Sequence, residues 1–289
     1  MTTRYADLHI HSYYSDGTLT PQEIIDKALS KQIDIIAITD HNELNGSREL
    51  MRLDKPKGFT CIPGFELDAM YCSTNIHILA YNVDLYDNDF IQFVNRNADL
   101  LEQTNIELIK RLSKDYNEIT QEEYDRFLYD RRKGGWKALH YFQYKGIVTT
   151  LEDSFKLYFK YGSAYNKTKF PSVEDVIKNI HLAGGKAILA HPGRVFKSLT
   201  IEKLKETLDN LFLLGIDGVE CYYPSHTKEQ QNLFTNICKN NKIITSGSDC
   251  HGDFEETEIG EMNTSIEVLN NIEFLLSTNT NIKLANQGE

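Results

Sequence analysis

Residues 7–41 read DLHIHSYYSDGTLTPQEIIDKALSKQIDIIAITDH, and this stretch contains an apolar run, an amphipathic segment and a second apolar run. The amphipathic segment carries the signals of a helix start, because Thr20 fits the N-cap, Pro21 the first turn and Glu23 a capping box. Short apolar runs on either side of such a helix are typical of buried strands. The stretch therefore predicts a strand, a helix and a second strand, which is the unit of an α/β protein.

The same rhythm continues in two further parts of the chain. Parallel strands interleaved with helices predict an α/β barrel or a doubly wound sheet, and fully apolar runs indicate strands that are buried on both faces. Counting the apolar runs gives about seven strands, which are centred on residues 6–12, 33–41, 59–69, 75–83, 187–193, 215–223 and 243–251.

The pattern changes between about residues 87 and 170, where long polar helical stretches contain no convincing buried strand. Residues 87–115 predict one long helix, and a second helix is expected to begin at Thr120 with Glu123 completing its capping box. We interpret residues 87–170 as a helical insertion in a domain formed by residues 1–86 and 171–289.

Composition and charge limit the classes of function. Hydrophobic residues make up 40% of the 289 residues and charged residues 25%, as in an ordinary globular protein. The net charge of −11 argues against a groove for duplex nucleic acid, which needs clustered Lys and Arg. No apolar run approaches the roughly 18 residues that span a bilayer, and the first residues lack a signal-peptide pattern. We expect a cytoplasmic protein with reduced, structural cysteines and no membrane partner.

Ionisable side chains of one chemical kind occur near the ends of all the expected strands. Because the carboxyl ends of parallel strands form one rim, these side chains should converge there. His9 and His11 are two residues apart and share a strand face, so both can bind one ion. Six of the nine histidines belong to this set, which favours a metal centre over separate structural roles, whereas His140 and His181 lie in helical segments and are read as structural. The set comprises His9, His11, Asp40, His41, Glu66, His77, His191, Glu220, Asp249 and His251.

The sequence resembles the PHP (polymerase and histidinol phosphatase) family of metal-dependent phosphoesterases over about residues 1–86 and 171–289. The resemblance implies a distorted (β/α)7 barrel, which agrees with the strand count. The insertion lies where the nucleotide-phosphoesterase branch of the family carries a small helical domain, so residues 87–170 are expected to cap the substrate. The matching motifs are DLHIHSYYSDG (7–17), ITDHN (38–42), PGFEL (63–67), IHILAY (76–81), LAHPGR (189–194) and GSDCHG (247–252).

The resemblance also implies a centre of two or three divalent cations. Imidazole and carboxylate ligands without thiolate suit Mn²⁺, Fe²⁺ or Zn²⁺, and the sequence does not choose among them. A carboxylate that bridges two ions roughly 3.5–4 Å apart leaves room for a hydroxide, the expected nucleophile. Asp40 is a less certain partner, and Glu220 is expected to orient a ligand. The implied ligand sets are His9, His11, Glu66 and Asp249; then Glu66, His77 and His191; then Asp16, His41 and His251, with Asp16, His41 and Glu66 also expected to be catalytic.

Three further features are candidates for contact with a phosphorylated substrate. Arg194 follows a predicted ligand closely and can bind phosphate in a bidentate manner. His226 is a candidate phosphate contact or general acid, and a purely structural histidine at a helix start is nearly as well supported. The basic loop 131–137, with Trp136 and Lys137, either closes over a nucleotide or is an ordinary solvated loop.

These observations predict a hydrolase for a small anionic phosphate ester. The expected substrate is a nucleotide, either a nucleoside monophosphate or a 3′,5′-bisphosphonucleotide, or an oligonucleotide end. Histidinol phosphate or another small phosphomonoester is an alternative that the large insertion disfavours. An amidohydrolase could use a similar centre but would leave Arg194 without a purpose. A non-catalytic metal-binding module is disfavoured because a structural site needs one closed ion.

Overall fold

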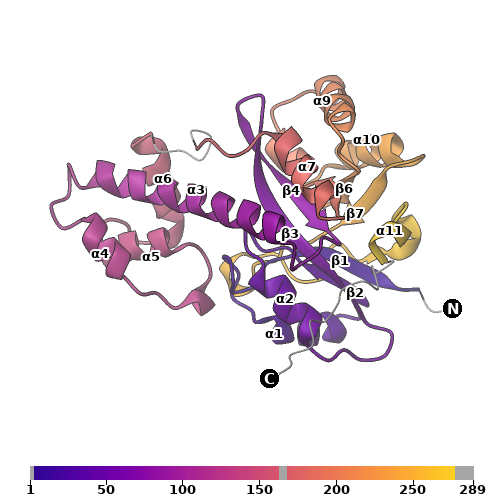
Figure 1. Ribbon diagram of the computed structural model, residues 1–289, viewed down its shortest axis with the longest axis horizontal. Coiled ribbons are helices and arrows are strands. Elements are labelled where there is room, and N and C mark those ends of the chain that lie inside the picture. Colours follow the sequence, from indigo (N-terminus) through magenta and orange to yellow (C-terminus); the bar gives the residue numbers. More distant parts are fainter. Residues whose placement is uncertain (1–2, 163–167, 277–289) are drawn as a thin grey trace.

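The computed structural model describes residues 3–162 and 168–276, and its central feature is an eight-stranded sheet curled into a nearly closed barrel (Figure 1). The segment after β7 lies against β1, because the amides of Asp249 and His11 donate to His9 O and Cys250 O, both at 2.9 Å. The predicted distorted barrel is thus confirmed. Parts of the predicted units, residues 1–2, 163–167 and 277–289, lie outside the described residues. The strands are β1 (Tyr5–Ile10), β2 (Ile35–Ile38), β3 (Thr60–Tyr71), β4 (Thr74–Tyr81), β5 (Lys186–Leu189), β6 (Gly218–Tyr222), β7 (Ile243–Ser246) and β8 (Thr264–Ser265), in the spatial order β7-β6-β5-β4-β3-β2-β1-β8.

One long strand is not parallel to its neighbours. β4 pairs antiparallel with both β3 and β5, so the expectation of a uniformly parallel set is wrong there. The chain reverses between β3 and β4 at Cys72 and Ser73, whose φ angles are 46° and 65°. His77 therefore lies in the first half of its strand, opposite Asp68 of β3, and not at a carboxyl end. It reaches the rim because β3, with 12 residues, continues beyond the 4-residue β2.

The helices that cover the barrel begin and end close to their sequence signals. The hydroxyl of Thr20 accepts from Glu23 N at 3.2 Å and Thr20 N donates to the Glu23 carboxylate at 2.8 Å, which confirms the predicted capping box. α7 ends before Gly184, whose φ of 82° requires the left-handed region. These helices are α1 (Pro21–Ser30), α2 (Asn45–Arg52), α7 (Val173–Leu182), α8 (Pro192–Val195), α9 (Ile201–Leu213), α10 (Lys228–Cys238) and α11 (Glu273–Leu276).

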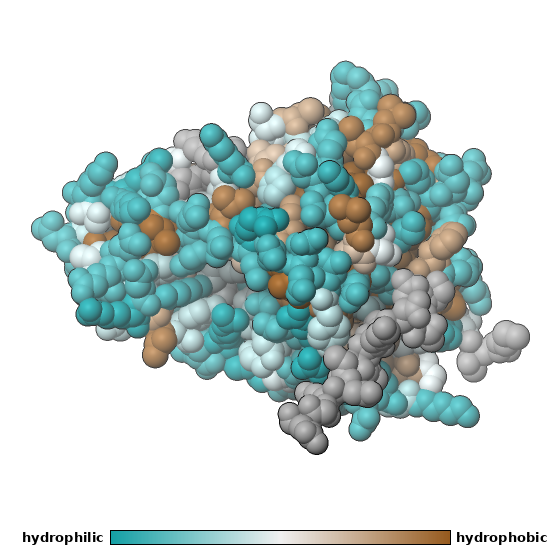
Figure 2. Space-filling view, in the orientation of Figure 1, coloured by the Kyte–Doolittle hydropathy of each residue, from teal (hydrophilic) through white to brown (hydrophobic). Residues whose placement is uncertain are grey.

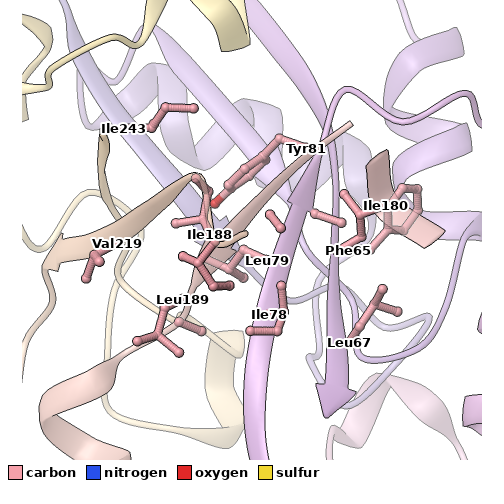
Figure 3. Close-up of a cluster of buried hydrophobic side chains, with 14 of the residues drawn as sticks. Phe65, Leu67, Ile78, Leu79, Tyr81, Ile180, Ile188, Leu189, Val219 and Ile243 are labelled. Atoms are coloured by element: carbon pink, nitrogen blue, oxygen red, sulfur yellow. The ribbon is translucent and has the colours of Figure 1, made fainter. Parts of the chain in front are cut away.

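Aliphatic and aromatic side chains fill the barrel and the layer between its strands and helices (Figure 3). All four residues of β2 are buried, as expected for a strand covered on both faces. Tyr81 is fully buried and donates its hydroxyl to Leu8 O at 2.6 Å, which ties β4 to β1 across the barrel. Figure 3 shows the packed set Phe65, Leu67, Ile78, Leu79, Tyr81, Ile180, Ile188, Leu189, Val219 and Ile243.

Residues 88–160 contain helices and extend to one side of the barrel (Figure 1). The predicted long helix is confirmed as α3 (Asn88–Leu112). Thr120 caps the next helix through Glu123 N at 3.2 Å, but Thr120 N donates to the Tyr141 hydroxyl at 3.4 Å, so the expected reciprocal bond is replaced. These helices enclose their own buried cluster, which includes Leu108, Tyr124 and Phe142. The other elements here are α4 (Gln121–Arg126), the 3-10 turn η1 (Arg131–Lys133), α5 (Lys137–Tyr144) and α6 (Leu151–Lys160).

The outer surface of the described residues is largely hydrophilic on the face seen in Figure 2, where hydrophobic side chains form small separate groups. In the described part of the chain, every helix is either too short or too polar to cross a membrane.

Candidate metal centre

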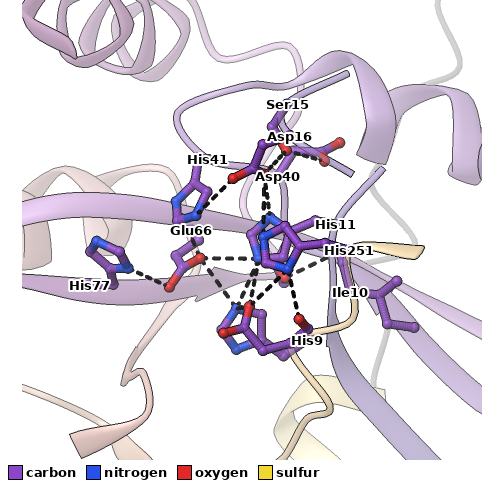
Figure 4. A network of polar contacts seen from close by, with 12 residues as sticks. His9, Ile10, His11, Ser15, Asp16, Asp40, His41, Glu66, His77 and His251 are labelled. Atoms are coloured by element: carbon purple, nitrogen blue, oxygen red, sulfur yellow. Dashed lines mark hydrogen bonds and ion pairs between the residues drawn. The ribbon is translucent and has the colours of Figure 1, made fainter. Parts of the chain in front are cut away.

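Imidazoles and carboxylates from distant strands meet at one rim of the barrel (Figure 4). They form three groups in which one ligand atom from each residue lies within 4.8 Å of the others. The first group has the same members as the first predicted ligand set, and another adds His11 to the predicted third set. The second predicted set is met in part, because His41 joins Glu66 and His77, while His191 Nε2 lies 2.9 Å from Glu66 Oε1. The groups are His9, His11, Glu66 and Asp249; His11, Asp16, His41 and His251; and His41, Glu66 and His77.

The geometry of the first group suits a cation. His9 Nδ1 lies 2.9 Å from Glu220 Oε1. When Nδ1 donates its proton in a hydrogen bond to this carboxylate, Nε2 is unprotonated and carries a lone pair. That lone pair faces His11 Nε2 at 3.1 Å and carboxylate oxygens of Glu66 and Asp249, each at 3.2 Å. In addition, no residue in the described part of the chain offers a hydrogen-bond partner to the buried His11 Nδ1. Converging acceptors of this kind are stabilised when a divalent ion lies between them.

The electric field of the carboxylates sets the protonation of the metal-free histidines. Burial lowers the pKa of His11, but hydrogen bonds to Asp249 and Glu66 outweigh it and raise the pKa to about 10. Burial also opposes the charged form of His77, yet the carboxylate of Glu66 helps to raise its pKa to about 10. For His41 burial dominates and lowers the pKa to about 4. Without a metal, His11 and His77 are therefore protonated near neutral pH, and these protons must leave before the two rings can coordinate a cation.

We expect cation binding near neutral pH to release more than two protons, because His9, whose pKa the carboxylates also raise well above its usual value, must become neutral to coordinate, as must His11 and His77. Below the pKa of about 10 that His11 and His77 share, protons compete with the metal, so affinity should rise as pH rises toward that value. Calorimetric titration of Mn²⁺ into EDTA-treated protein, in buffers of different ionisation enthalpy, measures the released protons. An observed enthalpy that does not depend on the buffer would contradict this protonation pattern.

Asp40 lies beside the centre but belongs to none of the three groups, which corrects the view of it as a possible ligand. Its carboxylate accepts hydrogen bonds from Ser12 N at 2.7 Å, Ser12 Oγ at 2.6 Å and Ser15 Oγ at 2.7 Å. A Cβ atom at Gly46 would lie 1.8 Å from Asp40 Oδ2, so glycine is required there. Asp40 thus positions the loop that carries Asp16.

Asp68 is a residue of the centre that the sequence analysis missed. Its Oδ1 lies 3.4 Å from His77 Nε2, and its two oxygens accept from Asn42 Nδ2 at 2.6 Å and Asn75 Nδ2 at 2.8 Å. His77 can therefore donate to Asp68 and present Nδ1 to Glu66, 2.8 Å away. The signal was available, because Asp68 follows Glu66 by two residues on one strand and so shares its face.

Replacing Asp68 by asparagine should weaken metal binding about 10- to 100-fold, the usual effect of removing a carboxylate behind a histidine ligand. His77 would keep its place but lose the charge that fixes its tautomer. Competition for Mn²⁺ with a chelating dye measures the change. Asp209→Asn is the matched control, because Asp209 is exposed on α9 and pairs with Lys205. Equal affinities in the two variants would contradict the positioning role.

Glu220 and Arg194 both form hydrogen bonds to members of the centre. Glu220 is buried and accepts from His9 Nδ1 at 2.9 Å and from His191 N at 2.8 Å, in agreement with its expected orienting role. Arg194 Nη1 donates to Asp249 Oδ2 at 2.9 Å and to the Tyr223 hydroxyl at 3.1 Å. The Arg194 side chain is still 53% exposed, so its guanidinium is both anchored at the rim and accessible.

The contacts of His226 fit the second of its two interpretations, a structural histidine near a helix start. Its Nδ1 donates to Cys221 O and its Nε2 accepts from Gly193 N, both at 3.1 Å. Burial lowers the pKa of His226, which keeps the ring neutral and suits this pair of bonds. Both nitrogens are engaged in supporting the turn after His191, so the structure argues against a phosphate contact or general acid here.

The basic loop 131–137 is docked on the barrel. Gly135 N donates to Asp16 O at 2.7 Å, and Arg132 pairs with Glu23 at 2.9 Å. Lys137 Nζ lies 4.4 Å from the centre of the Tyr124 ring and does not line the pocket over the metal centre, which corrects its expected role there. Trp136 does line that pocket, with its ring centre 5.7 Å from that of His41.

A pocket of about 310 Å³ opens directly over the three groups. Its floor is formed by the imidazoles and carboxylates, and Arg194 also lines the pocket. Its other walls include apolar side chains, Leu101, Trp136 and Phe155 from the helical region and Phe254 from the barrel, together with the polar Asn75 and Glu255. A volume near the lower end of the usual range for small-molecule sites fits a ligand with one charged and one flat apolar part.

The pattern of the PHP domain matches residues 7–187, which include six of the nine predicted metal ligands. The chain belongs to the PHP family. The PHP fold is also seen in a crystal structure from Bifidobacterium adolescentis, of a protein assigned as a metal-dependent phosphoesterase, which aligns with a TM-score of 0.75 at 24% identity over 95% of this chain and 96% of that one.

Two curated relatives match along most of their length. A 5′-3′ exoribonuclease from Haemophilus influenzae is 30% identical over 90% of this chain and 94% of its own. A 3′,5′-nucleoside bisphosphate phosphatase from Chromobacterium violaceum is 25% identical over 85% of this chain and 86% of its own. The matched regions include the helices of residues 88–160, so the similarity extends beyond the barrel.

Proposed function

We propose that the chain is a metal-dependent phosphoesterase that hydrolyses a phosphate ester of a nucleotide or of an oligonucleotide end. The observation that carries this proposal is a largely buried set of imidazoles and carboxylates at the floor of an open pocket that Arg194 also lines. The activities of the exoribonuclease and the bisphosphate phosphatase support the choice of substrate class.

The centre would hold two or three Mn²⁺, Fe²⁺ or Zn²⁺ ions with the residues of the three groups and His191. Such ions neutralise the charge of phosphate oxygens and lower the pKa of water, so that hydroxide is available near neutral pH. Glu220 and Asp68 fix the tautomers of His9 and His77. Arg194 binds the non-bridging oxygens of the phosphate, and its bond to Asp249 holds it in place.

The helical region supplies the part of the pocket that recognises the rest of the substrate. Leu101, Trp136 and Phe155 form a wall against which a base can stack and from which water is excluded. We therefore propose that residues 87–170 act as a substrate cap on the barrel formed by residues 1–86 and 171–289. The net charge of −11 does not oppose an anionic substrate, because the bound cations determine the local field. A cytoplasmic location fits these substrates.

The direct test is metal-dependent release of phosphate or mononucleotide from a panel of nucleoside monophosphates, 3′,5′-bisphosphonucleotides and short RNAs. We expect turnover of a nucleotide substrate with Mn²⁺ and none after EDTA. Histidinol phosphate and amide substrates belong in the same panel. Turnover confined to those compounds, or none at all with full metal occupancy, would overturn the proposal in favour of another esterase, an amidohydrolase or a binding module.

A further inference from the structure

The pocket over the metal centre is the first of three adjoining hollows. A second hollow of about 270 Å³ shares His41, Leu101 and Trp136 with it. A third hollow of about 370 Å³ shares Tyr14 with the second and lies along α2. Because each pair has wall residues in common, the hollows lie next to one another in a row from the metal centre to residues of α2, and we call this row the path.

The second hollow combines aromatic rings with cations. Trp136, Tyr14 and Tyr129 line it, together with Arg131 and Lys137. Arg131 is exposed and is held by a bond from its Nη1 to Tyr14 O at 3.0 Å. Lys137 thus lines the second hollow, next to the pocket over the metal centre and not within it.

The acids of the second hollow are engaged with the protein itself. Glu43 Oε1 accepts from Leu44 N and Asn45 N, both at 2.8 Å, at the start of α2. Glu102 Oε2 accepts from Asn105 Nδ2 at 3.0 Å and from the Tyr124 hydroxyl at 3.1 Å. Hydrogen bonds to these carboxylates reduce their repulsion of an anion in the hollow.

The third hollow carries a local excess of positive charge. Its charged residues are Arg48, Arg52 and Glu49, and the Glu49 carboxylate accepts from the Tyr14 hydroxyl at 2.7 Å. Arg48 donates to Leu85 O at 2.8 Å through Nη2, which fixes its guanidinium against the wall. Arg52 is exposed and its Nη2 lies 3.2 Å from the hydroxyl of Tyr86, another ring of this hollow.

We propose that these hollows bind successive nucleotides of a single-stranded oligonucleotide, with its terminal phosphate ester at the metal centre. Single strands are recognised by rings that stack on bases and by cations that follow the backbone, which is the combination found along this path. Trp136 lies between the first and second bases. Arg131 and Lys137 contact the phosphate of the second nucleotide, and Arg48 and Arg52 contact the phosphate of the third. This inference rests on the proposed function and makes an oligonucleotide, in preference to a mononucleotide, the best substrate.

The kinetic test compares RNAs of one to five nucleotides with a common terminal phosphate ester. We expect kcat/KM to rise about tenfold from one nucleotide to three and then to level off, because three hollows are filled. Arg52→Gln should lower the ratio of kcat/KM for the trimer to that for the monomer about fivefold, mainly through KM. Arg126→Gln is the control, since Arg126 is an exposed arginine on α4 that pairs with Glu122 and is not among the residues that line the three hollows.

A binding test separates this inference from the proposed function. Fluorescence anisotropy of a labelled, non-hydrolysable RNA pentamer is measured with the metal-loaded protein at several salt concentrations, so no hydrolysis is needed. The slope of log affinity against log salt should fall by about 0.7 in Arg52→Gln, the value for one phosphate contact on a single strand. An unchanged slope, or kcat/KM that does not depend on length in an active enzyme, would overturn the path. Loss of turnover on every ester with a normal salt slope would overturn only the catalytic assignment.

Discussion

Glu66→Gln should lower kcat for phosphate ester hydrolysis on the order of 10³-fold, at the upper end of the effect of removing one electrostatic contact from an active site. Glu66 is fully buried at the middle of the centre, and its two oxygens are shared by two of the three groups. A neutral amide would not balance the charge of cations held by these groups. Its carboxylate lies within 3.3 Å of ring nitrogens from His9, His11, His41, His77 and His191.

The measurement pairs turnover with metal content per chain, determined by plasma mass spectrometry. Glu122→Gln makes the same chemical change at an exposed position of α4 and should alter neither quantity. A Glu66→Gln protein that keeps both its full metal content and its turnover would show that this carboxylate is not the link between the cations.

Arg194→Gln should lower kcat about 10²-fold while the metal content stays near its normal value. The guanidinium lines the pocket and, under the proposed function, would offer its positive charge to phosphate oxygens there. Arg194→Lys should restore little, because an ammonium group cannot reproduce the planar fork that binds phosphate through two parallel bonds.

Steady-state kinetics and the same metal analysis separate this role from support of Asp249. Arg126→Gln, which removes an exposed guanidinium from α4, serves as the control. If Arg194→Gln loses metal in parallel with activity, then its bond to Asp249 matters more than its contact with substrate, and the proposed phosphate role is wrong.

Much of the fold could be predicted because its signals are local. The caps at Thr20 and Thr120 and the glycine after α7 each depend on a few neighbouring residues, and the apolar runs mark the strands. The direction of β4 could not be predicted, because an apolar run reads the same in either direction. Its turn is formed by Cys72 and Ser73, which lack the Asn-Gly signal of a tight hairpin.

The members of the centre were predictable for a related reason. Ligands such as His9, Glu66 and Asp249 lie at or just beyond strands, and the barrel brings such positions to one rim. The positions of His226 and Lys137 depend on how a loop packs against distant segments, which no spacing in the sequence reports. Asp68 was missed although its strand face was known, because a second acid beside a ligand looks like ordinary strand polarity.

The reversed direction of β4 has a mechanical consequence for the helical region. Tyr81 pairs with Gly64 near the start of β3, so the chain leaves the barrel at the end remote from the metal centre. α3 spans the return in one piece, since its 25 residues reach about 37 Å. Asn97 bonds to the backbone of Asp68 at 3.2 Å, and later turns enter the core of the helical region. The helix thus forms a rigid link between the barrel and the helical region. Deletion of a single residue within it would rotate the following turns and the rest of the helical region by about 100°. The side chains that this region contributes to the pocket would then move away from the candidate metal centre.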